Sequence, residues 1–219
     1  MFHDRHDAAV RLLRKLQGYR GRRDALVLAI PRGGLPIGGL LARELGLPLD
    51  VILTKKIGHP YNPEFAIGAV SLTGETLDEA LAAREGIPAD WISAEIARIR
   101  EQLRERYRLY HGAGKPLPVA GKTVILTDDG AATGRTLLVA IELLRREGAA
   151  KIVAAIPVAP PETVELLEAR ADEVVCLEVP SSFMAIGEFY GDFSQVSDQE
   201  AAAILRKEGA WSSSVTETR

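Results

Sequence analysis

Two adjacent carboxylates and two nearby hydroxyls are the residues of this chain whose types and spacing best suit a defined chemistry. The apolar residues 124–126 predict a buried strand, and Asp128 and Asp129 follow at its carboxyl end, after Thr127. Thr133 and Thr136 follow, just before an apolar run with helical spacing. Open parallel sheets bind ligands at the carboxyl ends of their strands, and the N-terminus of a helix favours an anion. The segment therefore predicts a bound ribose phosphate, with the carboxylates placed for sugar hydroxyls or a divalent cation.

A simpler interpretation of the same segment is a polar turn that caps a helix, with acids near the positive end of that helix. This interpretation explains Thr133 or Asp129 taken alone. It does not explain the order and spacing of the whole run, and we therefore favour the phosphate site.

The run from Val124 to Leu137 resembles the binding motif for phosphoribosyl diphosphate (PRPP) in the type I phosphoribosyltransferases. The shared features are an apolar strand, two acids, three small or apolar residues and the sequence Thr-Gly-x-Thr. The resemblance covers most of residues 25–193, and this run is its highly specific part. It implies a transferase of the pentosyltransferase class that moves the phosphoribosyl group of PRPP to a nitrogenous base and releases diphosphate.

The resemblance also implies a role for each residue of the run. Asp128 and Asp129 hold the ribose hydroxyls, directly or through Mg²⁺, the implied cofactor, which binds mainly through PRPP and water. Asp192 is implied to lie near the metal and the diphosphate. The residues implied to surround the 5′-phosphate are Gly130, Ala131, Ala132, Thr133, Gly134, Arg135 and Thr136.

Two further segments are candidates for binding the diphosphate. The sequence Pro-Arg-Gly-Gly at 31–34 follows a predicted strand, and its glycines would let the backbone approach a ligand closely. Lys55 and Lys56 end the second predicted strand, and such crowding of like charges favours a nearby anion. The alternatives are a plain strand-to-helix turn and surface lysines that keep the chain soluble. The resemblance implies diphosphate contacts from Arg32, Gly33, Gly34, Lys55 and Lys56, and counts Arg32 and Lys56 with the two acids as catalytic.

A mobile lid and a cover for the base are also implied. Residues 55–65 are rich in Gly, Pro and polar side chains; they are predicted to form a long loop and match the lid in position. His59 in this loop is an acid–base group or an exposed histidine, and we favour the second. Residues 180–210 match the hood, with Phe183 in the position that stacks on the base. The alternative for these aromatic residues is a hydrophobic lobe packed on the core.

One residue departs from part of the family. Members that use 6-oxopurines carry an aspartate at the third position after the acid pair, whereas this chain has Ala132, as in the adenine- and orotate-type motifs. The resemblance therefore disfavours a 6-oxopurine and leaves the identity of the accepting base open.

Alternating strands and helices must position these residues. Continuous apolar runs predict five buried strands, at residues 25–30, 49–54, 124–127, 152–158 and 173–179. Helices are predicted at residues 4–17, 33–45 and 88–110, after the acid pair, at 161–169, and as a short last helix opened by a capping box at Ser197. Residues 66–72 are a candidate strand that pairs with the segment after Gly74. This alternation predicts an α/β fold with an open, mainly parallel five-stranded sheet flanked by helices and a small C-terminal hood.

We predict one domain over residues 1–210. Its parts are a core at about 25–179, the lid at 55–65, a helical insert at 76–111 and the hood at 180–210; residues 211–219 are predicted to be a flexible tail. The helix at 88–110 has one apolar and one charged face, and its role is open between a dimer contact and extra packing.

The composition is that of a soluble globular protein, with 219 residues, 47% hydrophobic, 26% charged and a net charge of −3. It lacks the basic face that nucleic-acid binding requires, and no segment reaches the length of a membrane span. The one cysteine, Cys176, excludes an intrachain disulfide and is expected in the core. The charged start of the chain is unlike a signal sequence, so we expect a cytoplasmic protein. We also expect a homodimer.

These observations lead us to expect a Mg²⁺-dependent phosphoribosyltransferase of nucleotide metabolism, in purine or pyrimidine salvage. The main alternative is a catalytically silent, PRPP-binding regulatory protein. Such regulators usually carry a nucleic-acid-binding element, and the absence of a basic face counts against one here. A sugar-phosphate hydrolase is a third hypothesis, but it leaves the spacing of Thr-Gly-Arg-Thr at 133–136 unexplained.

Overall fold

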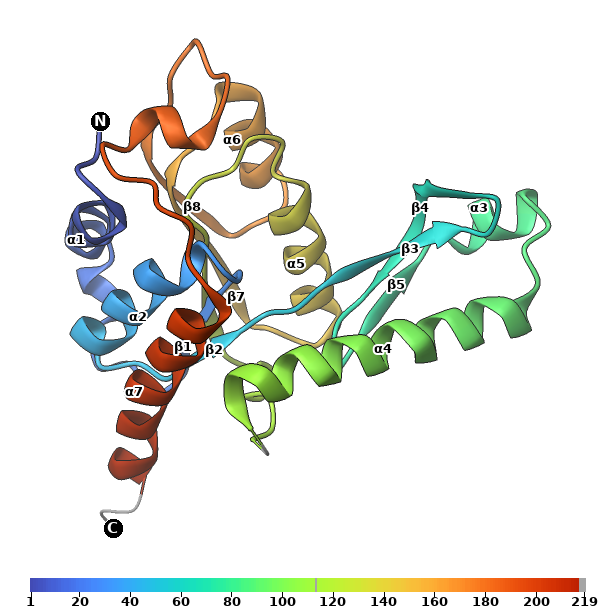
Figure 1. Ribbon diagram of the computed structural model, residues 1–219, viewed down its shortest axis with the longest axis horizontal. Helices are drawn as coiled ribbons and strands as arrows, with labels where there is room; N and C mark the ends of the chain where they lie inside the picture. The colour runs from blue at the N-terminus through green and yellow to red at the C-terminus, as the bar shows by residue number, and fades with distance from the viewer. Residues whose placement is uncertain (113, 217–219) are drawn as a thin grey trace.

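A five-stranded parallel sheet forms the centre of the computed structural model, which describes residues 1–112 and 114–216, the side chains of 209–216 excepted. The strand order is β2-β1-β6-β7-β8, and every neighbouring pair is parallel (Figure 1). The strands are β1 (Ala25–Ala29), β2 (Leu49–Val51), β6 (Thr123–Thr127), β7 (Lys151–Val158) and β8 (Glu173–Glu178). The predicted α/β sheet is confirmed, and the largest error lies in β2, which ends three residues earlier than predicted.

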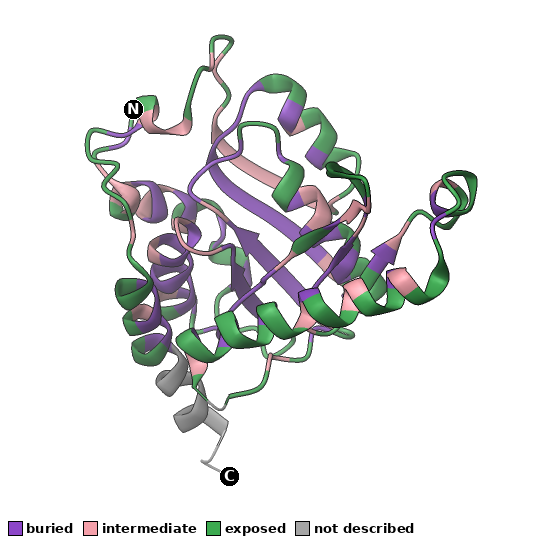
Figure 2. Ribbon diagram, turned by 45° about the vertical axis from the view of Figure 1, so that its right-hand side comes forward, coloured by how far each residue is buried: buried purple, intermediate pink, exposed green. Residues whose placement is uncertain are grey.

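Helices cover both faces of this sheet, which explains the continuous apolar strands. Every residue of β1 and β6 is buried. Alternate strand residues pack into two different clusters: Val27 and Ile125 lie on one face, Leu26 and Val124 on the other. The first cluster includes side chains of α1 (Arg5–Lys15) and α2 (Gly34–Leu45), and the second those of α5 (Arg135–Arg146) and α6 (Pro161–Glu168). Figure 2 shows the buried sheet between these layers. The edge strand β8 is only half-buried along its length, so the prediction of a fully buried strand is wrong there.

Local sequence signals set the helix ends, and the capping box predicted at Ser197 is confirmed. The carboxylate of Asp4 caps α1 by accepting a hydrogen bond from the Asp7 N–H at 2.8 Å. Helix α2 stops at Gly46, whose φ of 68° lies in the left-handed region that favours glycine. Ser197 and Glu200 form the reciprocal bonds of a capping box at the start of α7 (Asp198–Thr216).

A second, three-stranded antiparallel sheet replaces the loop predicted at 55–65. It contains β3 (Lys55–His59), β4 (Asn62–Val70) and β5 (Glu75–Leu77), in the order β3-β4-β5. The prediction of a long loop is therefore wrong, whereas the expected pairing of residues 66–72 with the segment after Gly74 is confirmed. With α3 (Glu79–Arg84) and α4 (Ala89–His111), this sheet forms an arm that reaches away from the central sheet (Figure 1).

Close backbone approach explains two glycines of this sheet, of which Gly58 lies in the segment predicted to be a loop. A Cβ on Gly68 would overlap the backbone carbonyl of Thr76 on β5, and a Cβ on Gly58 would overlap the backbone of Pro63 on β4. Only Ile57 in β3 is fully buried, so the strand lacks the apolar run by which the other strands were predicted.

Helix α4 buries the predicted apolar stripe. Ile92, Ile99, Leu103, Tyr107 and Tyr110 are buried, and Ile96 is half-buried. The helix packs against β3, β4 and α7, which gives it the extra-packing role left open by the sequence.

The C-terminal segment differs from the prediction in length and position. The last helix, predicted to be short, runs over 19 residues and packs against α2 and α4. The segment near the sheet edge is therefore residues 180–196, with a 3-10 turn at Ile186–Phe189, rather than the whole of 180–210. The predicted tail at 211–219 falls on residues whose side chains lie outside the described structure, and 217–219 lie entirely outside it.

Two smaller expectations concern membranes and the cysteine. Within the described residues, no helix combines the length and apolar character needed to cross a membrane. Cys176 packs against the cluster on the α5 side of the sheet, and burial raises the pKa of its thiol to about 11.

A buried carboxylate joins α4 to the central sheet. Asp50 in β2 is 1% exposed and accepts hydrogen bonds from the Tyr107 hydroxyl at 3.1 Å and the Leu117 N–H at 2.8 Å. The Nε2 atom of His111 lies 2.8 Å from the same carboxylate, and the His111 ring stacks on Tyr107. The C-terminal half of α4 and the segment after it are therefore held to β2 by one acid.

We predict that Tyr107→Phe lowers the free energy of unfolding by about 2 kcal/mol, because a buried charged acceptor loses a donor. The control is Tyr61→Phe, which removes a hydroxyl from a side chain that is 93% exposed and should change little. Urea unfolding measures both variants. Equal stability of the two would contradict the anchoring role of Asp50.

Candidate functional site

The acid pair lies at the carboxyl end of β6, where the chain leaves the sheet. Asp129 is 8% exposed; Asp128 is half-buried as a whole residue, but its carboxyl group lies deep enough for burial to dominate its pKa. Burial raises the pKa of both carboxyls, and for Asp128 the charge of Asp129 adds to the rise. Asp128 Oδ1 accepts the Asp129 N–H at 2.8 Å, and no basic side chain among the described residues forms an ion pair with it. Asp128 is thus a buried carboxylate still open to a ligand.

Asp129, in contrast, is already paired. Nε and Nη2 of Arg5, from α1, donate to Asp129 Oδ2 at 2.9 and 2.8 Å. Burial raises the pKa of Asp129, and the contact with Arg5 offsets part of that rise. The two acids therefore have different surroundings, although the sequence suggested the same role for both.

The turn after the acids is fixed from outside and leads directly into α5. Three hydrogen bonds hold it: the Tyr190 hydroxyl to the Asp129 carbonyl at 2.6 Å, the Ala131 N–H to the Val158 carbonyl at 2.9 Å, and the Thr163 hydroxyl to the Ala132 carbonyl at 2.7 Å. Gly134 has a φ of 66°, and α5 begins at the next residue. No side chain caps this helix start, so its backbone N–H groups are available to an anion.

Asp128 and this helix start share one hollow of about 200 Å³. Its lining is Asp128, Gly130, Ala131, Ala132, Thr133, Gly134, Arg135, Thr136, Leu137 and Ile186. The structure therefore brings together the predicted phosphate-binding residues and one of the two acids. A carboxylate beside an anion-binding helix start suits a ligand that carries both hydroxyls and a phosphate.

The Arg-Gly-Gly loop lies directly beside the acids. A Cβ on Gly33 would overlap the Asp129 carboxylate, and one on Gly34 would lie 2.7 Å from the Thr127 carbonyl. Glycine is therefore required at both positions. The Pro31–Arg32 peptide bond is cis, and Arg32 Nη1 lies 3.7 Å from Asp198 Oδ2 at the start of α7. The predicted diphosphate loop thus borders the acid pair.

The two lysines make contacts on the arm. Both are exposed at the start of β3; Lys56 Nζ donates to Glu64 at 2.7 Å and Lys55 Nζ to Gln102 at 2.7 Å. Among the described contacts neither lysine reaches the acid pair. His59 is half-buried and lies near the rings of Tyr61 and Phe65.

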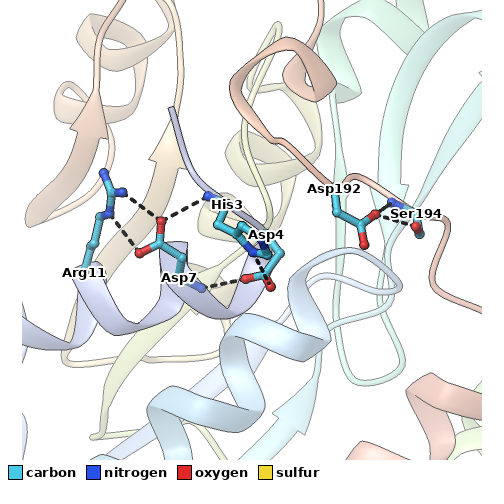
Figure 3. Close-up of polar contacts among 6 residues, drawn as sticks. All are labelled: His3, Asp4, Asp7, Arg11, Asp192 and Ser194. Atoms are coloured by element: carbon cyan, nitrogen blue, oxygen red, sulfur yellow. Dashed lines mark hydrogen bonds and ion pairs between the residues drawn. The ribbon is translucent and has the colours of Figure 1, made fainter.

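Phe183, predicted to stack on the base, and Asp192, predicted to lie near the metal and the diphosphate, both contact neighbouring residues. Phe183 is half-buried and stacks on Phe189 at a ring-centroid distance of 5.4 Å. The Ser194 hydroxyl and the Ser194 N–H, the latter at 2.9 Å, donate hydrogen bonds to Asp192 and lower its pKa (Figure 3). The backbone N–H of Asp192 donates to the His3 carbonyl at 2.8 Å, so this acid lies beside the N-terminus.

The donor set limits what metal the protein could hold alone. Across residues 1–112 and 114–216, no three His, Cys, Asp or Glu side chains gather as a metal site. Asp128 supplies a buried, unpaired carboxylate, the kind of oxygen ligand that Mg²⁺ accepts. Mg²⁺ typically keeps several waters and binds through one or two carboxylates together with substrate phosphates, and the residues present fit that arrangement.

Arg5, Thr163 and Tyr190 were missed by the sequence analysis. Arg5 lies 124 residues from Asp129 along the chain, and the spacing of Arg5 in the sequence gives no signal of that contact. Thr163 and Tyr190 donate hydrogen bonds to backbone carbonyls of residues 129–132. A motif of side-chain types does not predict such contacts with the backbone. Only a three-dimensional arrangement reveals them.

Known proteins resemble this chain over most of its length. The family model described as "Phosphoribosyl transferase domain" matches residues 3–193. Two Mycobacterium tuberculosis proteins, "Putative phosphoribosyl transferase Rv0571c" and "Putative phosphoribosyl transferase MT0597", are 35% identical over 206 residues, which are 94% of this chain and 46% of theirs. The chain therefore spans about half the length of these curated relatives. The crystal structure of TT1426 from Thermus thermophilus is 40% identical, with a TM-score of 0.81, over 96% of this chain and 98% of that chain.

The raised pKa of Asp128 yields a prediction about stability. An acid whose pKa is raised by folding destabilises the fold once it is ionised, so this cost grows as pH rises through the raised pKa and is relieved as pH falls. We predict that, without ligand or divalent cation, Asp128→Asn stabilises the fold at pH 8 by about 1–3 kcal/mol, the scale for an incompletely compensated buried polar group. The difference in unfolding free energy between Asp128→Asn and the unaltered chain should become smaller as the pH falls toward 5.

Asp129→Asn is the matched contrast and should destabilise the fold, because Arg5 then loses its charged partner. Thermal unfolding between pH 5 and pH 8 measures both variants. If the difference in stability between Asp128→Asn and the unaltered chain does not change with pH, this prediction is contradicted.

Proposed function

The chain belongs to the phosphoribosyl transferase domain family, and from that premise we propose that it transfers the 5-phosphoribosyl group of PRPP to a nitrogenous base and releases diphosphate. One observation carries the proposal: the unpaired carboxylate of Asp128 and the uncapped start of α5 border the same hollow. A ribose phosphate would place its hydroxyls at the carboxylate and its phosphate at the helix start.

The donor half of the reaction has a place for each charged part of PRPP. The N–H groups of the turn at 132–136 and the hydroxyls of Thr133 and Thr136 would bind the 5′-phosphate. Gly33 would bring its backbone N–H group to the diphosphate, and Arg32 would exchange its 3.7 Å contact with Asp198 for a diphosphate oxygen. The Gly34 N–H donates to the Ile30 carbonyl, so Gly34 would contribute only the close backbone approach. Lys55 and Lys56 are exposed cations that would add to this site if the arm turned toward it.

Mg²⁺ would be held at Asp128, mainly by oxygens of PRPP and by water, and would neutralise charge on the departing diphosphate. The protein's own contribution is placement and electrostatics. Asp128 fixes the ribose, the helix start fixes the 5′-phosphate, and Arg32 stabilises the negative charge that develops on the leaving group.

The accepting base is the least determined part of the proposal. We propose a nucleobase, bound near Phe183, whose ring at present stacks on Phe189. Ala132 offers no carboxylate for a proton of the base, and its carbonyl is taken by Thr163. We further propose that the reaction serves purine or pyrimidine salvage and that the protein is a cytoplasmic homodimer. Its ligands would be PRPP and the base, with no nucleic acid or membrane as partner. These parts of the proposal rest on the family resemblance.

Incubation of the protein with PRPP, Mg²⁺ and a panel of nucleobases tests the function. We predict diphosphate release that depends on one base, and a fall of about 100-fold in kcat/KM for Asp128→Asn, the scale of losing one transition-state electrostatic contact. The matched control is Asp24→Asn, an exposed acid at the opposite end of β1 that is paired with Arg22. PRPP binding without turnover across the panel would favour the regulatory alternative, and no PRPP binding would contradict the proposal.

The role of Phe183 has a separate test. We predict that Phe183→Ala raises KM for the accepted base by about tenfold, because stacking of a base on an aromatic ring contributes about 1–3 kcal/mol. KM for PRPP should change little, and Phe65→Ala, an exposed aromatic on the arm, should change neither constant. Equal effects of Phe183→Ala on both KM values would remove Phe183 from the base site.

A further inference from the structure

Arg5 contacts two parts of the site region, the acid pair and the C-terminal segment at residues 193–194. Its Nε and Nη2 donate to Asp129 Oδ2, and its Nη1 donates to the Ser194 carbonyl at 2.7 Å. The guanidinium also lies over the Phe193 ring, 4.1 Å from the ring centre. The Arg5 and Asp129 side chains are only 12% and 11% exposed, so the pair is largely removed from water. A charge in such a place requires its partner.

The partner of Arg5 is the residue that orders the acid pair. The Asp129 N–H donates to Asp128 Oδ1, its carbonyl accepts the Tyr190 hydroxyl, and its carboxylate lies against the backbone of Gly33. Asp129 thus touches the diphosphate loop, the C-terminal segment and the free carboxylate of Asp128. A displacement of Asp129 would therefore move all three.

The N-terminus and the C-terminal segment reach Arg5 as one unit. The Phe2 N–H donates to the Phe189 carbonyl, and the Gly191 N–H donates to the Phe2 carbonyl. The rings of Phe2 and Tyr190 lie 5.3 Å apart, and those of Tyr190 and Phe193 5.0 Å apart. This aromatic packing holds α1 beside residues 189–194 and places Arg5 over the acid pair.

We propose that Arg5 is a positioning residue for PRPP binding: through its ion pair with Asp129 it holds the Asp128 carboxylate toward the hollow. This inference rests on the proposed function. It assigns the two acids different tasks, since Asp128 contacts the ribose or its metal, whereas Asp129 fixes Asp128 and the loop at 32–34. The N-terminal helix, which the donor-site motifs do not include, becomes part of the donor site.

The same helix offers a matched control. Arg11 also donates through Nε and Nη2 to a carboxylate, that of Asp7, and also lies over a ring, that of Phe2 at 5.1 Å. Figure 3 shows this pair on α1. Among the described contacts Arg11 does not reach the acid pair, so Arg11→Gln removes an ion pair of similar geometry, though a more exposed one, without touching the site.

Calorimetric titration with PRPP and Mg²⁺ tests the proposal. We expect Arg5→Gln to raise the Kd by about tenfold or more, the effect of removing one partner of a buried charged hydrogen bond. Arg5→Lys, which restores the charge, should stay within about threefold of the unaltered chain, and Arg11→Gln within about twofold. Because Arg5 acts through Asp129, the double variant Arg5→Gln, Asp129→Asn should bind no more weakly than Asp129→Asn alone.

Amide hydrogen exchange, measured by NMR without ligand, supplies an independent readout. The Asp129 N–H should exchange about tenfold faster in Arg5→Gln, because local opening becomes easier, and should be unchanged in Arg11→Gln. An unchanged Kd in Arg5→Gln, or a raised Kd with unchanged exchange at Asp129, would overturn the proposal. If the unaltered chain binds no PRPP, the proposed function fails, and unchanged Asp129 exchange in Arg5→Gln would then overturn the positioning role as well.

Discussion

Two adjacent carboxylates at the end of β6 repel each other in a buried place, and much of the surrounding architecture compensates that repulsion. Arg5 neutralises Asp129, and Tyr190 holds the backbone of the same residue. Among the described residues, Asp128 accepts a hydrogen bond from the N–H of Asp129 alone, and its pKa remains raised. A ligand that brings hydroxyls or a cation to Asp128 would therefore relieve a cost that folding leaves in place.

The elements that meet at this point come from distant parts of the chain. Helix α1 supplies Arg5, the loop after β1 supplies Gly33, α6 supplies Thr163, and residues 189–194 close the arrangement. The parallel sheet makes the meeting possible, because the carboxyl ends of β1 and β6 lie side by side. The precise placement of the turn at 130–134 thus depends on the whole fold rather than on its own sequence.

Local patterns were enough to predict the central sheet and the turn between β6 and α5. β1 and β6 are continuous apolar runs because both of their faces are covered, and the turn carries its small residues and threonines in sequence. The hairpin of β3 and β4 was missed because only Ile57 of β3 is fully buried and glycines serve close strand contact there. Arg5 was missed because an ion pair across 124 residues leaves no periodic signal.

A crystal structure of the protein with PRPP and Mg²⁺ would test the central claim most directly. We predict the 5′-phosphate in the hollow at the start of α5, within hydrogen-bond distance of the N–H groups of the turn, and the ribose hydroxyls at Asp128. Asp129 should remain paired with Arg5. A sugar phosphate bound elsewhere, with Asp128 and the turn making no contact to it, would contradict the proposed site.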